Sequence, residues 1–372
     1  MKNIISAFTI SILCLSLINS CAQERNIVGK DMTETLSLVE KSYITEGPLV
    51  GMVIGIVKQG KVETYTFGSK EAGKKELPDN KTIFEIGSIT KTFTGTILAI
   101  QATHEQLTLE QPISKYLPED VKVPQYEGKS ITFLDLATQS SSLPRMPRNF
   151  NSYVKNSKDP YINYPVSALY ENLNQTNLDK PIGQTYEYSN LGFGLLGHLE
   201  GLVDSSDYET ALQTMILDKL EMNATKVRVD EEVNKNLALP HQGEKIVSQW
   251  EFTDAFMGAG TIKSNLHDML IYLKANMYPE STSLEEAIML ARKPQRPAGG
   301  GQIGLGWHIA KSKTSQAPLI WHNGGTGGYQ SFMGFNQSED LGVVILVNTS
   351  TRSGQEATTL GFQLLEALET FN

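Results

Sequence analysis

Three short patterns in the sequence combine a nucleophile, a proton carrier or a glycine-rich turn at spacings that suit acyl transfer. They are Ser-x-x-Lys at Ser88 and Lys91, Tyr-x-Asn at Tyr188 and Asn190, and His-x-Gly at His322 and Gly324. A serine hydroxyl is a poor nucleophile until a neighbouring base takes its proton, and a desolvated lysine amine can be that base. Each spacing also recurs elsewhere in the chain, so the surrounding sequence decides which copies matter.

The context of Ser88 and Lys91 favours chemistry. An apolar segment ending in Gly87 precedes them and a long apolar segment follows, which predicts a helix entered through Gly87-Ser88. Free N–H groups at a helix start favour developing negative charge, and Lys91 lies one turn further on the same face. The alternative is a capping serine beside a surface lysine. Ser152 and Lys155 share the spacing but lie in an Asn-rich loop, where we expect no catalytic role.

The context of Tyr188 and Asn190 is a Pro- and Gly-containing turn followed by a helix of small residues. A tyrosine there can deliver or accept a proton near the serine, and Asn190 can hold a substrate amide. An ordinary half-buried aromatic is the alternative for Tyr188.

A Gly-dense segment, WHNGGTGGYQSFMGF, lies between two strand-like runs. A backbone with few side chains lets a substrate lie along a strand edge and can present an N–H to an oxyanion. Gly324, Gly325 and Thr326 are therefore candidate substrate-binding residues. The alternative is a bulged hairpin turn, which such glycines also form.

The elements that must position these residues come from both ends of the chain. We predict a helix near residues 32–44, a β-hairpin around Gln59-Gly60, strands in the last quarter and a closing amphipathic helix. This order predicts an α+β fold: one antiparallel sheet built from both termini and flanked by the terminal helices, with a mostly helical lobe of about residues 95–255 inserted. A site then forms where sheet and lobe meet.

The first residues predict export. Lys2 precedes an uncharged apolar stretch too short for a comfortable membrane span, so residues 1–20 are interpreted as a signal peptide. Leu17 to Cys21 resembles a bacterial lipobox, which implies cleavage before Cys21 and lipid attachment to its thiol. We expect a tether over 21–31, one catalytic domain over 32–372, and a protein anchored by its lipid to a bacterial membrane, facing the periplasm or the exterior.

Composition excludes several classes of protein. The formal net charge is −9 and no block of Lys and Arg occurs, so nucleic acid is not an expected partner. Gly192 to Gly197 fits G-x-G-x-x-G, but a turn precedes it in place of a strand, so it is interpreted as a close-packing helix face. G-x-S-x-G is absent and the six histidines are scattered. We expect no metal, no cofactor and a monomer.

Taken together, the three motifs and their order resemble the serine β-lactamase and penicillin-binding protein superfamily, within it the class C β-lactamase-like branch. The segments IFEIGSITKTFTG, PIGQTYEYSNLGFGLLG and MGAGTIKSNLHDML carry the same resemblance, from about Leu36 to Leu368. It implies Ser88 as nucleophile and Lys91 with Tyr188 as the proton-handling pair. It also implies Asn190 on the substrate amide and an oxyanion hole from the N–H groups of Ser88 and Gly325.

Two departures from that resemblance stand out. Class C β-lactamases carry Lys-Thr-Gly where this chain has His322-Asn323-Gly324, and many relatives have His-Thr-Ser-Gly where it has Gln139-Ser140-Ser141. We expect His322 to face the acyl site and, with an ordinary pKa of about 6.5, to bind carboxylates better as the pH falls toward roughly 6. Arg352 is expected to supply part of the missing positive charge.

The predicted function is a hydrolase that forms an acyl-Ser88 intermediate on an amide or lactam, as in β-lactam hydrolysis or D-alanyl peptide cleavage. The substrate is then a small molecule or a peptidoglycan-derived peptide. Two alternatives remain open: an esterase on the same fold, and a non-hydrolysing lipoprotein that binds penicillin or peptidoglycan.

Overall fold

The computed structural model describes residues 27–228 and 234–371. The predicted signal peptide, Cys21 and the first part of the predicted tether lie outside these residues. Ile27 lies inside the segment predicted as a tether, yet it is buried in an apolar cluster with strands of the sheet, so packing begins earlier than the predicted domain boundary at residue 32. Among the described residues, no helix has the length and apolar character needed to cross a membrane.

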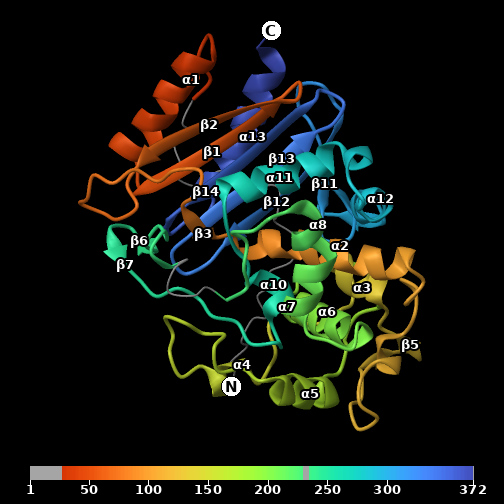
Figure 1. The fold of residues 1–372 in the computed structure, drawn as a ribbon. Coiled ribbons are helices and arrows are strands. Elements are labelled where there is room, and N and C mark those ends of the chain that lie inside the picture. Colours follow the sequence, from red (N-terminus) through yellow and green to blue (C-terminus); the bar gives the residue numbers. More distant parts are fainter. Residues whose placement is uncertain (1–26, 229–233, 372) are drawn as a thin grey trace, which may run out of the picture.

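A large antiparallel sheet joins the two ends of the chain (Figure 1). Its strand order is β2-β1-β14-β13-β12-β11-β10-β9. The strands are β1 (Gly51–Lys58), β2 (Lys61–Gly68), β9 (Arg296–Ala298), β10 (Gly301–Ile303), β11 (His308–Lys311), β12 (Pro318–Gly325), β13 (Gln330–Asn336) and β14 (Leu341–Val347). Because β1 pairs with β14 over most of its length, the sheet exists only when both termini have come together. The predicted α+β fold is confirmed.

The predicted hairpin between β1 and β2 is confirmed. Gln59 and Gly60 form its two-residue loop, with φ of 51° and 72°. Two positive φ angles match the right-handed twist of the flanking strands, and glycine adopts them at little cost.

The outer face of the sheet packs against the terminal helices α1 (Met32–Val39) and α13 (Glu356–Thr370). Met52, Ile54 and Ile56 of β1 point to this face and join Leu360 and Leu364 in one apolar cluster. The alternation places neighbouring residues of β1 on the opposite face, as the two-residue period of a strand requires. The sheet is therefore covered on both sides.

The inner face packs against α11 (Leu266–Met277) and, beyond it, the helical lobe. Val53 and Val57 of β1 point inward, and Gly55 between them leaves room for the side chain of Leu270. Burying one such aliphatic side chain stabilises the fold by about 1.5–3 kcal/mol. This face also carries the residues of β12 that the sequence assigns to the site.

The helical lobe surrounds α2 (Thr90–Thr103), which is buried from Thr90 to Gln101. Around it lie α3 (Phe133–Ala137), α5 (Val166–Gln175), α6 (Asn190–Val203), α7 (Tyr208–Leu212), α10 (Met257–Gly260) and α12 (Glu285–Arg292). A helix that is buried on all sides must satisfy its polar side chains internally. Thr94 and Thr96 do so by donating to the carbonyls of Thr90 and Thr92.

Several short strands were not anticipated from the sequence. They are β9 and β10 at the sheet edge, the pair β3 (Ile83–Glu85) with β8 (Lys263–Asn265) and the pair β4 (Gln125–Tyr126) with β5 (Lys129–Ser130). A further small sheet has the order β15 (Thr349–Ser350), β6 (His241–Gln242), β7 (Lys245–Ile246). Strands of two or three residues are too short for an alternating pattern to be recognised. The β3–β8 pair matters most, because Ser88 follows β3 directly.

The glycines of α6 form a close-packing face, as the sequence predicts. A Cβ on Gly194 would lie 2.3 Å from the carbonyl oxygen of Ala255, and one on Gly197 would lie 2.7 Å from the Cα of Gly258. Backbone atoms cannot move aside as a flexible side chain can. Because these positions are glycines, the backbones of α6 and α10 can lie in direct van der Waals contact.

We predict that Gly194→Ala destabilises the protein by about 1–3 kcal/mol, because the new methyl group would overpack the α6–α10 contact. Gly192→Ala on the same helix is the matched control. The nearest atoms to its Cβ would be side-chain atoms of Ser189, at 3.3 Å, and of Ser141, at 3.7 Å, and alanine favours helix by up to about 1 kcal/mol over glycine. Urea unfolding of the two variants measures the difference; equal stabilities would contradict this account of the glycine face.

Candidate active site

Ser88 lies in a short helical turn between β3 and α2. The turn η2 (Gly87–Ile89) passes directly into α2, which confirms the helix entry expected at Gly87-Ser88. Gly87 has φ +50°, and a Cβ there would lie 2.7 Å from the amide nitrogen of Gly325. Both the conformation and the space therefore require glycine. Ser88 itself remains partly exposed, so a substrate can reach its hydroxyl.

Lys91 is completely buried beside this serine. Its Nζ lies 3.0 Å from Ser88 Oγ, 3.0 Å from Asn190 Oδ1 and 2.6 Å from the carbonyl oxygen of Ala259. Burial is the main cause that holds the pKa of Lys91 well below its usual value, and the positive charge of Arg145 lowers it further. The amine is therefore poised to be uncharged.

The three partners of Lys91 determine how the N–H groups and the lone pair of a neutral amine are oriented. The amide oxygen of Asn190 and the carbonyl of Ala259 only accept hydrogen bonds, so they take the two N–H groups. In the structure Nζ of Lys91 donates to Ser88 Oγ. When the amine is neutral, its lone pair is the group left for Ser88, and the serine hydroxyl can then donate to it. This is the arrangement that a general base needs before it removes the serine proton.

Tyr188 lies beside Lys91, and desolvation raises its pKa where it lowers that of the lysine. Burial raises its pKa to about 12, against the lowering effect of a hydrogen bond with Ser88 and of the charge on Arg145. Its ring lies 4.9 Å from Nζ of Lys91. The raised pKa favours the protonated form of Tyr188, while the lowered pKa of Lys91 favours its uncharged form.

The loop that carries Tyr188 is held by a segment whose function the sequence did not reveal. The side-chain oxygen of Gln139 accepts from the N–H of Ser189 at 2.7 Å, and its carbonyl accepts from the N–H of Glu187, also at 2.7 Å. The carbonyl of Ser140 accepts from Gly183 at 2.7 Å. This segment thus holds the backbone on both sides of Tyr188, and of these bonds the one from Ser189 to the Gln139 side chain depends on the residue type at the departure.

The N–H of Gly325, at the end of β12, faces away from the neighbouring strand β13. Thr326 N–H donates to the carbonyl of Tyr329 at 3.0 Å, so these two residues form a hydrogen-bonded pair. In an antiparallel ladder the next pair, Gly325 with Gln330, is then non-hydrogen-bonded. On the other side β11 pairs with β12 only as far as Trp321. The Gly325 N–H is thus free beside Gly87 and Ser88, where an oxyanion would form.

Gly324 and Thr326 are placed differently from Gly325. A Cβ on Gly324 would lie 2.0 Å from the carbonyl oxygen of Ile86, so this glycine allows β12 to approach the serine turn. Thr326 is buried beside the Glu85 carboxyl. Of the three candidates in this segment, Gly325 has the geometry that suits direct contact with a substrate.

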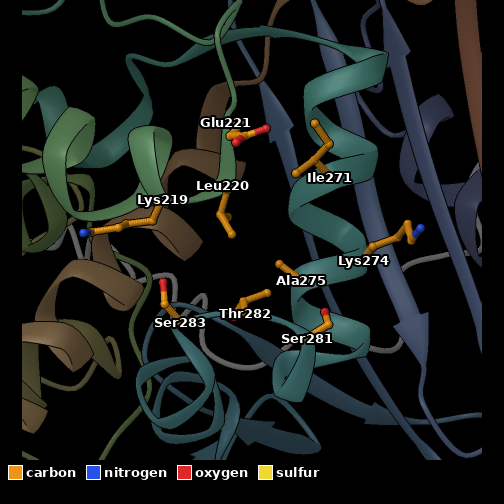
Figure 2. A pocket seen from close by; sticks show the side chains of 9 residues that line it. All are labelled: Lys219, Leu220, Glu221, Ile271, Lys274, Ala275, Ser281, Thr282 and Ser283. Atoms are coloured by element: carbon orange, nitrogen blue, oxygen red, sulfur yellow. The ribbon is translucent and has the colours of Figure 1, made fainter.

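A surface hollow of about 350 Å³ lies away from this site (Figure 2). It is formed by residues 219–221 at the end of the helical lobe, by α11 and by residues 281–283. None of the candidate catalytic residues lines it. Between residues 27 and 228 and from 234 to 371, no group of three or more His, Cys, Asp or Glu side chains is placed to hold a metal ion.

Residues 36–366 match the family model named Beta-lactamase. The chain belongs to the beta-lactamase family. It is 28% identical over 397 residues to a beta-lactamase of Escherichia coli strain K12, covering 96% of this chain and 99% of that protein. It is also 23% identical over 355 residues to the D-alanyl-D-alanine-carboxypeptidase/endopeptidase AmpH of the same strain, covering 91% of this chain and 90% of AmpH.

The fold agrees with membership of the beta-lactamase family. The crystal structure of the class C beta lactamase from Rhodobacter sphaeroides superimposes with a TM-score of 0.76 at 22% sequence identity. It covers 88% of this chain and 97% of that one. The predicted resemblance is therefore confirmed at the level of the beta-lactamase family, and the fold matches that of a class C beta-lactamase.

His322 behaves differently from the titratable group expected at this position of the family. It is 1% exposed, and its Nδ1 lies 2.6 Å from the carbonyl oxygen of Asn323. Burial, then the neighbouring His308 and Lys91, hold its pKa well below the usual value. His308, which lies 4.9 Å away between ring centres, is half-buried, and desolvation followed by the charge of Lys91 lowers its pKa to about 4. The expectation that His322 gains charge as the pH falls toward 6 is wrong, because burial disfavours the imidazolium.

We predict that activity depends on pH through Lys91 and not through His322. Lys91 is a base only above its lowered pKa, so kcat/KM should fall as the pH drops through that value and stay level above it, since Tyr188 keeps its proton until about pH 12. Because burial holds the pKa of His322 well below its usual value, His322→Gln should leave the midpoint of the acid limb unchanged. Initial rates across the pH range test this; a shifted midpoint in the variant would show that His322 titrates.

Proposed function

We propose that the protein hydrolyses an amide or lactam through an acyl-Ser88 intermediate. Membership of the beta-lactamase family makes it a serine hydrolase, and the proposal concerns which residues act and on what. The observation that carries it is the buried amine of Lys91 at hydrogen-bond distance from Ser88. Neither a binding protein nor a capped helix start needs a desolvated lysine there.

The acylation step follows from the contacts around Ser88. Lys91 takes the proton from Ser88 Oγ as the oxygen attacks the substrate carbonyl. The N–H groups of Ser88 and Gly325 stabilise the oxyanion that forms. Tyr188 donates a proton to the leaving nitrogen and is reprotonated through Lys91. Asn190 orients the amine of Lys91 through its side-chain oxygen, and its amide nitrogen is available to a substrate carbonyl.

Two substrate classes share this step. The curated relatives include beta-lactamases and the D-alanyl-D-alanine-carboxypeptidase/endopeptidase AmpH, so we propose β-lactams or D-alanyl peptides as substrates. They differ in how fast water attacks the acyl-enzyme. An esterase uses the same nucleophile and base, and a non-hydrolysing binding lipoprotein would keep the acyl group or form none.

Intact-protein mass spectrometry over time tests the proposal. We expect a penicillin, a cephalosporin or a D-Ala-D-Ala peptide to give a Ser88 adduct. A transient adduct indicates a lactamase, a lasting one a peptidase or a binding protein, and no adduct an esterase. Ser88→Ala should abolish the adduct and lower turnover by several orders of magnitude while leaving the circular dichroism spectrum unchanged.

Lys91→Gln is the companion variant. Because serine and lysine act as one unit, the double variant should be no slower than the slower single variant. Undiminished turnover in Ser88→Ala would contradict the nucleophile assignment, and additive losses would contradict the assignment of Lys91 as its base.

We also propose that the protein is exported and anchored by lipid on Cys21. The support is the lipobox-like segment Leu17 to Cys21 behind an uncharged apolar stretch. Stable anchoring needs two or more acyl chains, which lipoprotein processing supplies.

We predict that Cys21→Ala is exported but carries no lipid, because that thiol is the only one in the predicted mature chain. Metabolic labelling with a fatty acid, followed by fractionation, measures it. Label retained in Cys21→Ala would contradict the proposed processing.

A further inference from the structure

Arg145 lies in the loop that follows α3 and faces Tyr188. Its backbone is hydrogen-bonded to the segment that carries Tyr188 and Asn190. The carbonyl of Arg145 accepts from the N–H groups of Asn190 and Leu191 at 3.0 and 3.2 Å. The hydroxyl of Ser189 donates to the carbonyl of Pro144 at 2.7 Å. The Cα of Arg145 is therefore held in register with Tyr188 and Asn190.

The guanidinium of Arg145 lies over the ring of Tyr188, 5.0 Å from its centre, while the residue remains exposed. Its charge reaches the reaction centre, since it lowers the pKa of both Lys91 and Tyr188. In the part of the chain that the structure describes, no carboxylate lies within ion-pair distance of it. Arg145 thus presents a permanent positive charge and a planar set of donors beside the acyl site.

The other basic groups near the site cannot supply a fixed positive charge. His322 is buried and His308 half-buried, and desolvation lowers the pKa of both imidazoles. Lys91 is buried and bonded on three sides, and its role as a base requires the uncharged form. Arg352, the cation expected from the sequence, is exposed and is not among the charges that shift Lys91 or Tyr188.

We propose that Arg145 binds the free carboxylate of the substrate, the role that His322 in the third motif cannot perform. This inference rests on the proposed function, because it names which acyl substrates the site prefers. The guanidinium offers two parallel N–H donors that match the two oxygens of a carboxylate, and stacking on Tyr188 keeps it oriented. Substrates that carry a carboxylate are then selected over neutral esters and amides of the same shape.

A matched pair of ligands tests this: a cephalosporin with a free carboxylate and its methyl ester. Binding is measured by calorimetry in a Ser88→Ala background, so that it does not depend on turnover. Arg145→Gln should weaken binding of the acid by about 10- to 100-fold, the range for a charged hydrogen-bonded pair, and leave the ester within about twofold. Arg145→Lys should retain part of the preference, since it keeps the charge but loses the planar pair of donors.

Arg148→Gln is the control, because Arg148 is exposed on the same loop and only its backbone N–H is bonded, to Asn172. It should leave both ligands unaffected. Equal affinity of the arginine protein for acid and ester, or an equal loss for both in Arg145→Gln, would overturn the proposal. So would failure of the acid to bind at all.

A kinetic measurement separates this proposal from a purely structural role. With Ser88 present, Arg145→Gln should raise KM for the acid with little change in kcat at a pH above the acid limb. A loss of kcat for both ligands would instead assign Arg145 to holding Tyr188. If the acid binds through Arg145 but never forms an adduct on Ser88, the proposed function fails while this inference stands.

Discussion

The site depends on the burial of one amine. A charged ammonium without a carboxylate partner costs several kcal/mol to remove from water, so the fold favours the neutral form of Lys91. Two carbonyl oxygens take its N–H groups, and one of them belongs to Ala259 of α10. The glycines of α6 allow α10 to come close enough to provide that carbonyl. Helix packing in the lobe thereby controls the basicity of the group beside Ser88.

Burial is the main cause of the pKa shifts of both Lys91 and Tyr188, and it shifts them in opposite directions. Burial disfavours the charged form of any group, which lowers the pKa of the lysine and raises that of the tyrosine. The same desolvated space therefore favours an uncharged amine on Lys91 and a protonated hydroxyl on Tyr188, which is the division of roles that we propose. Arg145 adds to this by opposing positive charge on Lys91, so the loop beside Tyr188 influences both the electrostatics and the entrance of the site.

Much of this arrangement was predictable from the sequence, because it rests on local patterns. The hairpin at Gln59-Gly60, the helix entry at Ser88 and the closing helix each follow from turn chemistry or periodicity. What the sequence did not indicate depends on contacts between distant segments. Gln139 looks like an ordinary polar residue until its side chain meets Ser189. The neutrality of His322 depends on how deeply β12 is covered, which no spacing of residues reveals.

The pairing of β1 with β14 has a consequence for when the chain becomes reactive. Gly325 lies on β12, whose place in the sheet depends on strands from the opposite end of the chain, and it meets Ser88 only across the gap left by Gly87. A chain that is still being synthesised lacks this juxtaposition, so the N–H of Gly325 does not yet lie beside its serine. The reactivity that we propose for Ser88 therefore requires the completed fold, and the serine should not react with substrate until the last strands have joined the sheet.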